Sequence, residues 1–304
     1  MRRGWVLMVA AVAIAGLATA SCDTGPRVGD GVIDLEWAKF DEPKVPTPEA
    51  DVCRAGAGGA RDQVDWEMPL FDAPTLQCTQ QHRSETFYVG TLTAAEAAQD
   101  GPPGLGDAVY RAAYSRCATQ ANTFLGGDWH RARVAVVPLL PSDRQWQGKA
   151  RWYRCEMVEV ADSWETVVNR SSTLRNGLRG SRPAAITCAN DNFNQKKPSG
   201  NNVVYVKCSV PHTVELTGLY TPKDGKYPGF EKAVDTALAK CFDVGARYLG
   251  MTPSALRNRG GISWIAWERG ENHWLLGDRS TRCYMGPYPT RKISGSIKGK
   301  RPPL

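Results

Sequence analysis

Apolar residues recur every three or four positions in two stretches of the chain, which is the spacing of an amphipathic helix. In the first stretch they are Tyr110, Ala113, Cys117, Ala121 and Phe124. Asp107 is a candidate N-cap of this helix and Gly126 a candidate stop. The second stretch predicts a helix from about Gly229 to Leu249, ended by Gly250.

Short segments rich in β-branched and aromatic residues predict strands on both sides of these helices. They are residues 86–89, 134–137, 152–160, 203–208 and 262–267. Gly-Gly and Pro clusters separate them. The pattern predicts an α+β fold made of two small units, each with short antiparallel strands and one helix.

Eight cysteines divide the body of the chain into two similar halves. They are Cys53, Cys78, Cys117 and Cys155, followed by Cys188, Cys208, Cys241 and Cys283. The gaps within each set are similar, and the residues around corresponding cysteines agree in the same order. Cys78 is followed by His82 and Glu85, for example, and Cys208 by His212 and Glu215. Agreement in several segments in one order indicates an internal duplication.

In an exported protein these eight cysteines are expected to form four disulfides that staple the two units. Pairing within each repeat leaves several connectivities, of which first with second and third with fourth is favoured. The favoured pairs are Cys53–Cys78, Cys117–Cys155, Cys188–Cys208 and Cys241–Cys283. No C-x-x-C spacing is present, which argues against a zinc knuckle or a thioredoxin-like redox pair.

The N-terminus has the three parts of a secretory signal peptide. Arg2 and Arg3 precede an apolar stretch, and small residues precede Cys22. A cysteine in this place resembles a bacterial lipobox, whose thiol is diacylated, so we expect Cys22 to be lipidated. The alternative is plain secretion with a free Cys22. The expected location is therefore the extracellular face of the plasma membrane, by a lipid anchor, or the secreted fraction.

The expected organisation follows from these features. Residues 1–21 are the signal peptide, 22–51 a Pro-rich tether, 52–161 the first repeat, 162–184 a connector that is a long loop or partly helical, 185–286 the second repeat, and 287–304 a basic tail. The formal net charge is +7. The leader and the tail account for it, so the balanced body argues against nucleic acid as a partner. The tail is either a contact for anionic lipid or wall polymer, or a solvated end.

Two pairs of ionisable residues recur in the repeats. They are His82 with Glu85 and His212 with Glu215. Residues three apart on a strand point to opposite faces, and a third metal ligand is not evident. We expect a structural role, in which His bonds a turn and Glu pairs with an Arg such as Arg151 or Arg279. A metal-binding module and an envelope hydrolase that uses these His residues are the alternatives.

Trp146 and Trp274 occupy equivalent positions and are expected to pack in the two cores. Trp264, Trp267 and Trp274 offer an alternative, an aromatic platform for a glycan or peptide. The sequence has no G-x-S-x-G, Walker A, H-E-x-x-H or Rossmann glycine pattern. No cofactor is expected.

Three motifs of the second repeat resemble the septum-formation domain of actinobacteria. They are Cys208-Ser-Val-Pro-His212-Thr-Val-Glu215, the stretch from Cys241 to Gly250, and the stretch from Trp274 to Cys283. The first repeat departs at Gln81, where the second has Pro211. The resemblance covers residues 50–286 and implies an envelope role linked to division in membrane-anchored proteins. It supplies no catalytic residues.

The sequence therefore predicts a non-enzymatic envelope lipoprotein that acts as a binding or scaffolding module. Its expected partners are envelope proteins or peptidoglycan, with a membrane contact through the N-terminal lipid.

Overall fold

The computed structural model describes residues 45–55, 64, 74–192 and 202–303. Lys44–Leu304 forms one compact unit. The predicted signal peptide, Cys22 and most of the predicted tether lie outside the described residues. No helix in the described part of the chain is long and apolar enough to cross a membrane.

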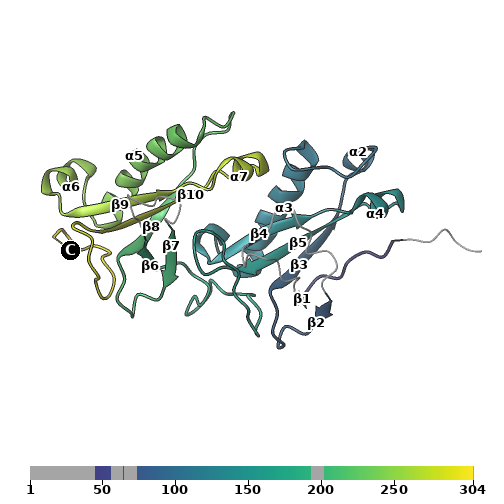
Figure 1. The fold of residues 1–304 in the computed structure, drawn as a ribbon, viewed down its shortest axis with the longest axis horizontal. Helices are drawn as coiled ribbons and strands as arrows, with labels where there is room; N and C mark the ends of the chain where they lie inside the picture. Colours follow the sequence, from purple (N-terminus) through teal and green to yellow (C-terminus); the bar gives the residue numbers. More distant parts are fainter. Residues whose placement is uncertain (1–44, 56–63, 65–73, 193–201, 304) are drawn as a thin grey trace, which may run out of the picture. The chain divides into compact units, whose positions relative to one another are not determined.

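The first repeat is an antiparallel sheet with the strand order β2-β1-β3-β5-β4 (Figure 1). Its strands are β1 (Val52–Arg54), β2 (Thr75–Leu76), β3 (Ser84–Thr91), β4 (Val134–Leu139) and β5 (Trp152–Glu159). Helix α3 (Ala108–Leu125) packs against β3, β4 and β5. It begins after Asp107 and ends at Gly126, whose positive φ of 77° suits glycine. The predicted helix is therefore confirmed at both ends.

The second repeat has the same architecture, with the strand order β7-β6-β8-β10-β9. Its strands are β6 (Cys188–Asp191), β7 (Val203–Val206), β8 (Val214–Tyr220), β9 (Ile262–Trp267) and β10 (Thr281–Pro287). Helix α5 (Phe230–Tyr248) packs against β8, β9 and β10. The pairing of strands has a register shift at an equivalent place in each sheet. In the first it lies between Thr86 and Tyr88 of β3, where β3 pairs with β5. In the second it lies where Cys283 and Tyr284 of β10 pair with β8. Two disulfide-stapled antiparallel units are thus confirmed.

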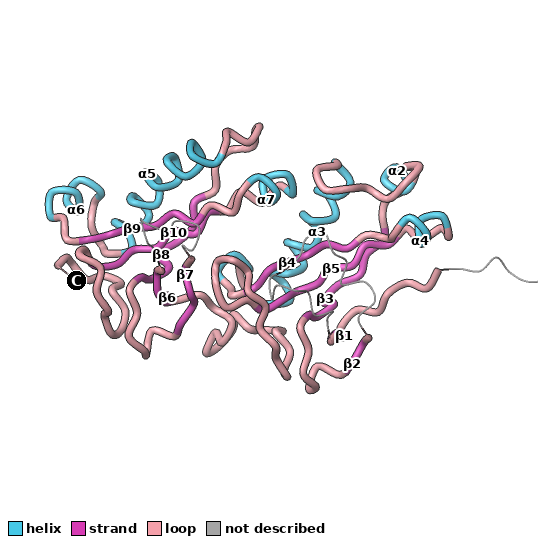
Figure 2. The backbone as a smooth tube through the Cα atoms, viewed as in Figure 1, coloured by secondary structure: helices cyan, strands magenta, loops and turns pink. Residues whose placement is uncertain are grey.

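Both repeats also contain short helices that the hydrophobic pattern does not predict (Figure 2). They are α2 (Ala94–Ala97), the 3₁₀ helix η3 (Trp129–Arg131), α4 (Asp143–Gln147), α6 (Pro253–Arg259) and α7 (Glu271–Leu276). Each is too short to show a helical period. Capping boxes at Thr93 and Ser142 begin two of them.

The four disulfides join the cysteine pairs that the sequence favours. Cys117 of α3 is bonded to Cys155 of β5, and Cys241 of α5 to Cys283 of β10. Cys53 of β1 and Cys188 of β6 are bonded to the cysteines that follow them in the chain. In each repeat one disulfide therefore ties the long helix to the sheet. The other ties the strand next to the edge, β1 or β6, to the turn before β3 or β8.

The two repeats share a core. Alternate residues of β4 face opposite sides of the sheet, as in any strand. Val134 and Val136 pack in the cluster that contains α3, whereas Ala135 packs with residues of the second repeat such as Val203 and Val214. Every position of β4 and β5 is buried as a result. The sequence of β4 is wholly apolar, as burial on both faces requires. The three charged residues of β5 are paired: Arg154 with Glu156, and Glu159 with Arg170.

Candidate functional site

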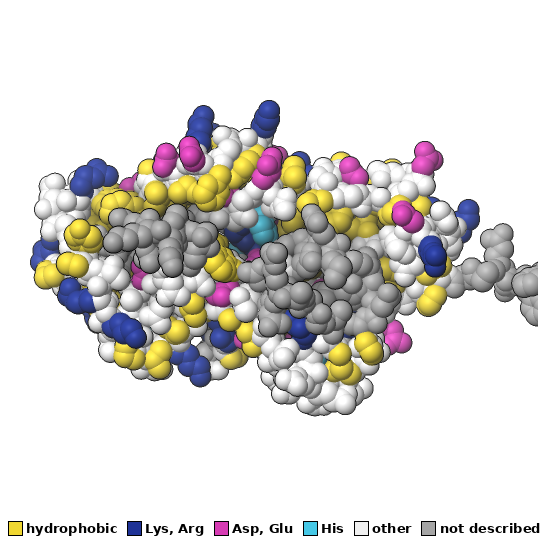
Figure 3. Space-filling model, in the orientation of Figure 1, with side chains coloured by type: hydrophobic (Ala, Val, Ile, Leu, Met, Phe, Trp, Pro, Cys, Tyr) yellow, Lys and Arg dark blue, Asp and Glu magenta, His cyan; other side chains and the backbone are white. Residues whose placement is uncertain are grey.

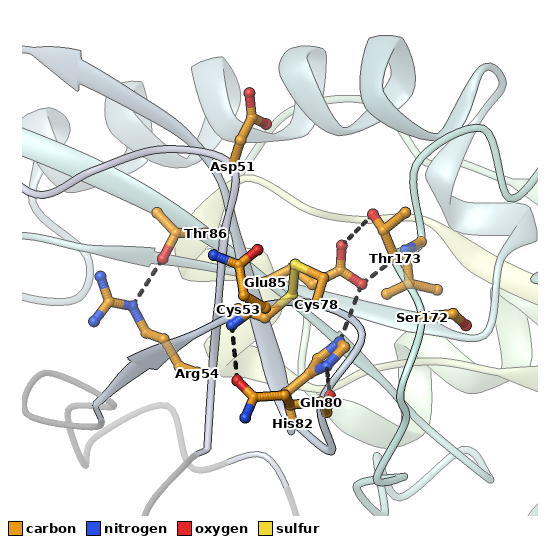
Figure 4. The surroundings of a disulfide bond; sticks show 12 residues. Asp51, Cys53, Arg54, Cys78, Gln80, His82, Glu85, Thr86, Ser172 and Thr173 are labelled. Atoms are coloured by element: carbon orange, nitrogen blue, oxygen red, sulfur yellow. Dashed lines mark hydrogen bonds and ion pairs between the residues drawn. A yellow bond between two sulfur atoms is a disulfide. The ribbon is translucent and has the colours of Figure 1, made fainter.

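The His-x-x-Glu pair of the first repeat lies where β3 begins, beside the Cys53–Cys78 disulfide (Figure 4). The ring Nε2 of His82 lies 3.6 Å from Oε1 of Glu85. The ring Nδ1 lies 2.8 Å from the carbonyl oxygen of Gln80, which can only accept. Both side chains are buried. The imidazole therefore lies between the carbonyl of Gln80 in the preceding turn and the carboxylate of Glu85.

Glu85 in turn binds the segment that the sequence assigns to the connector. The backbone N–H of Leu174 donates to its Oε1 at 2.7 Å, and the Thr173 hydroxyl donates to Oε2 at 2.7 Å. An isolated β-bridge joins His82 to Arg170. These contacts hold Leu174 in the first core, where it is 2% exposed.

The second repeat repeats this geometry with the C-terminal segment. Glu215 accepts the backbone N–H of Ile297 at 2.7 Å and the Ser296 hydroxyl at 3.0 Å. The Nε2 of His212 lies 3.6 Å from Glu215, and a β-bridge joins His212 to Ile293. Ile297 is buried in the core below α5 and α6. We call each of these arrangements a His–Glu bracket: His82 with Glu85, and His212 with Glu215.

The brackets bear on three expectations from the sequence. The carboxylates bind backbone N–H groups, and the arginine beside Glu85 is Arg170, whose Nε lies 3.6 Å from Oε1. The two named arginines lie elsewhere: Arg151 donates to carbonyls around Trp146, and Arg279 pairs with Asp224. The paired side chains do meet, because His82 and His212 precede the strands, so strand alternation does not apply to them. The described part of the basic tail is packed on the second repeat, and the connector has no helix but packs on the first.

The brackets are poor candidates for metal binding or hydrolysis. Two groups of potential ligands lie close together, Cys53 with His82 and Glu85, and Cys188 with Cys208 and Glu215. Their sulfurs are bonded in disulfides, so they are not thiolate ligands. Both imidazole rings are 0% exposed and give a substrate no access.

A cluster of buried charges between the repeats was not predicted from the sequence. Arg269 donates to Oδ2 of Asp278 at 2.6 Å and also to Glu165. The Tyr114 hydroxyl donates to Asp278 Oδ2 at 3.1 Å, and Nε2 of His130 lies 3.2 Å from Oδ1. Tyr114 and His130 belong to the first repeat, and Arg269 and Asp278 to the second. The cluster therefore links the two halves.

Burial and charge act in opposite directions on the pKa values in this cluster. Burial raises the pKa of Asp278, but Arg269 and His130 outweigh it and hold that pKa well below its usual range. Glu165 follows the same pattern, with Arg269 and His273 lowering its pKa. Burial, aided by Arg269, lowers the pKa of His273 to about 4. The carboxylates are therefore charged and His273 is neutral at neutral pH.

A pocket of about 380 Å³ opens next to this cluster, lined among others by Arg111, His130 and Asp278. The carboxylate of Asp278 already has all its hydrogen-bond partners within the protein, two at each oxygen. Its low pKa keeps Asp278 ionised at neutral pH, so it has no proton to give as a general acid. The cluster therefore has the properties of a structural link between the repeats.

The sequence analysis selected ionisable residues that recur in both repeats. It missed this cluster because the members of the cluster do not occupy equivalent positions in the two repeats. His130 and His273, which have no counterparts, were the one available signal. Only the packing of the second repeat against the first brings Glu165, Arg269 and Asp278 together.

The tryptophans divide between core and surface. Trp146 is buried, as predicted, whereas its equivalent Trp274 is half-buried and packs edge-on against Tyr227. Trp264 packs on Phe242 of α5, and Trp267 packs in the cluster shared by the two repeats. Because Trp264 and Trp267 face opposite sides of β9, the three residues do not form one platform.

A family model described as Septum formation matches residues 63–283. This is more than half of the chain. The chain belongs to the septum formation family. The family match runs as one span through both sheets and both long helices. No curated protein and no solved structure matches this septum-formation protein.

Proposed function

We propose that this septum-formation protein is a non-enzymatic binding or scaffolding module of the cell envelope. The observation that carries the proposal is the use of its recurring ionisable residues. His82, Glu85, His212 and Glu215 are buried, and their polar atoms face their own chain. Residues that are buried and bonded within the chain stabilise the fold. Recognition of a partner is therefore assigned to residues on the surface.

The proposal includes export and a lipid anchor at Cys22. Four disulfides support an oxidising compartment, because such bonds persist outside the cytosol. The signal-peptide pattern and the small residues before Cys22 support cleavage and acylation. Two acyl chains would keep the protein stably on the outer face of the plasma membrane. Its partners there are envelope proteins or peptidoglycan.

Imaging and fractionation of dividing cells test this proposal. A C-terminal fusion to a reporter that fluoresces outside the cytoplasm is expected at division septa and in the membrane fraction. Cys22→Ala is expected to move the protein to the medium or to the soluble fraction. Uniform distribution of the wild type through the cycle, or its retention in the cytosol, would contradict the proposal.

Metal analysis tests the metal-binding alternative separately. The purified protein and its His212→Ala variant are expected to hold no stoichiometric metal. Stoichiometric metal in the wild type that disappears in the variant would favour the metal-binding module.

A further inference from the structure

The second repeat carries a cluster of exposed basic residues, built from two segments far apart in the sequence. Residues 244–267 and 286–304 contain no Asp or Glu. The first segment supplies three basic residues and the second five, all exposed. They are Arg247, Arg257 and Arg259, with Arg291, Lys292, Lys298, Lys300 and Arg301. We call these eight residues the basic surface.

The His–Glu bracket is what brings the two segments together. Glu215 binds Ser296 and Ile297, and the backbone N–H of Gly299 donates to the Tyr248 carbonyl at the end of α5. Arg259 of α6 donates to the carbonyl of Pro302. A tail that was free in solution would present its charges in no fixed place. This one is fastened beside α6.

The basic surface also contains a hollow. A pocket of about 530 Å³ lies between α6 and the C-terminal segment, and Arg259 and Arg301 both line it, with Thr252 and Asn258. Two guanidinium groups with hydroxyl and amide neighbours are the donors that a phosphate group prefers. Figure 3 shows Lys and Arg side chains over the end of the protein that carries α6 and the C-terminus, at the left of the view.

We propose that the basic surface docks on an anionic phospholipid membrane, with lipid phosphates bound at the pocket between α6 and the C-terminal segment. Exposed apolar side chains lie beside the charges, Tyr288 at 66% and Val210 at 43% exposure. Val210 lies in the turn after Cys208, whose carbonyl accepts from Gly295. Basic residues with flanking aromatic and apolar side chains are typical of membrane-surface contacts. A wall polymer would supply charge but no apolar layer for these side chains.

The inference rests on the proposed envelope location, where the lipid at Cys22 places the protein next to a membrane. The acyl anchor would then raise the local concentration of the basic surface at the membrane, so a weak contact suffices. The basic surface would fix which face of the module points away from the membrane.

Vesicle sedimentation tests the inference apart from the lipid anchor. The probe is the exported chain from residue 22, with Cys22→Ser so that it carries no lipid. It is expected to bind vesicles of equal parts phosphatidylglycerol and phosphatidylcholine, to release with rising salt, and not to bind phosphatidylcholine alone. Failure here leaves septal localisation untouched, so the two proposals fail separately.

A matched pair of triple variants locates the contact. Lys292→Gln, Lys298→Gln and Lys300→Gln together are expected to weaken partitioning by about 100-fold, as three surface charges contribute. Lys223→Gln, Lys226→Gln and Lys232→Gln remove the same charge from exposed positions before and at the start of α5, and are expected to bind like the parent protein. Circular dichroism checks that both fold.

Three results would overturn the inference. The first is equal loss of binding in both triple variants, which would indicate a net-charge effect without a defined surface. The second is equal binding to neutral and anionic vesicles. The third is binding to purified anionic wall polymer with none to either vesicle.

Discussion

Two buried carboxylates, Glu85 and Glu215, hold segments that have no regular secondary structure of their own. Each accepts a backbone N–H and a hydroxyl from its segment. A buried carboxylate without such donors would be strongly destabilising. Here each carboxylate has its donors, and in return it accepts the buried backbone N–H of Leu174 or Ile297, which would otherwise have no partner. The recurring His-x-x-Glu motif is therefore explained by folding.

Glu215→Gln tests this role. The amide keeps the size of the side chain but loses the charge that strengthens bonds to Ile297, Ser296 and Tyr248. We expect the free energy of unfolding to fall by about 1.5–3 kcal/mol, and protease to cut the C-terminal segment sooner. Urea denaturation and limited proteolysis measure the two effects. Glu271→Gln, at an exposed position in α7, is the control; equal behaviour of the two variants would refute the bracket.

His273 gives the protein a defined response to acid. Its pKa is lowered to about 4 by burial, so it stays neutral in the folded protein while the unfolded chain gains a proton below about pH 6.5. Between these values the unfolded state binds more protons, and stability falls as the pH falls. Arg269, Arg282, Glu165 and Asp278 are the charged groups that act on it.

His130 acts in the opposite direction. Burial lowers its pKa, but hydrogen bonds to Asp128 and Asp278 outweigh burial and raise it. Its contribution to stability is therefore present at low pH and is lost as the pH rises through the folded pKa.

Two variants separate these effects. As the pH falls from 6.5 to 4, the free energy of unfolding of His273→Gln is expected to fall by about 2–3 kcal/mol less than that of the wild type. That of His130→Gln is expected to fall by more than that of the wild type. Urea denaturation across this range measures both. Parallel curves for the wild type and His273→Gln would show that His273 is not buried in its neutral form.

At the scale of elements, the helix–sheet disulfides define each repeat. Cys117 and Cys241 lie on the buried face of the two long helices, within the period that predicts those helices. Their partners lie on β5 and β10, the strands next to the edge strands β4 and β9. A disulfide at this position closes a loop of the chain, and it also holds the helix in place on its sheet. The duplication explains why both repeats have it.

Removal of one helix–sheet disulfide should be measurable. Cys241→Ala with Cys283→Ala opens a loop with a sequence separation of 42. We expect the free energy of unfolding to fall by about 3–4 kcal/mol, mainly because the unfolded chain gains freedom. Calorimetry of the double variant and the wild type under non-reducing conditions measures this. Unchanged stability in the double variant, or free thiols in the wild type, would contradict the assignment.

The two repeats form one folded unit, Lys44–Leu304, because they share an apolar cluster and a network of buried charges. The apolar part follows from β4 and β5, which are buried on both faces. The charged part is centred on Arg269, which lies between Glu165 and Asp278. A buried cation with two carboxylates is sensitive to loss of any one member.

Arg269→Met is therefore expected to destabilise the protein by about 3–5 kcal/mol, because it leaves Glu165 and Asp278 buried without their shared cation. Arg175→Met is the matched control, because Arg175 pairs with Asp51 and the two side chains are 47% and 64% exposed, so the change in stability should be about 0–1 kcal/mol. Thermal unfolding measures both. Equal effects would show that the charge cluster does not join the repeats.

The linear chain is sufficient to predict whatever depends on local periodicity and on repetition. The two long helices, five of the ten strands of the described residues, the two-unit α+β fold and the favoured four disulfide pairs follow from apolar spacing, glycine stops and cysteine order. The sequence pattern did not predict strands β1, β2, β6, β8 and β10 or the short helices, because polar residues or short length hide their period. These are local signals, read from neighbours in the sequence.

Tertiary structure alone decided what depends on contacts between distant segments. It brought residues 170–174 and 293–297 against the two glutamates, and so converted a predicted connector and tail into equivalent parts of the two repeats. It also assembled Glu165, Arg269 and Asp278, which share no motif. The physical reason is that a buried charge or N–H group takes the partner that the packed chain places within reach, and sequence spacing does not encode that distance.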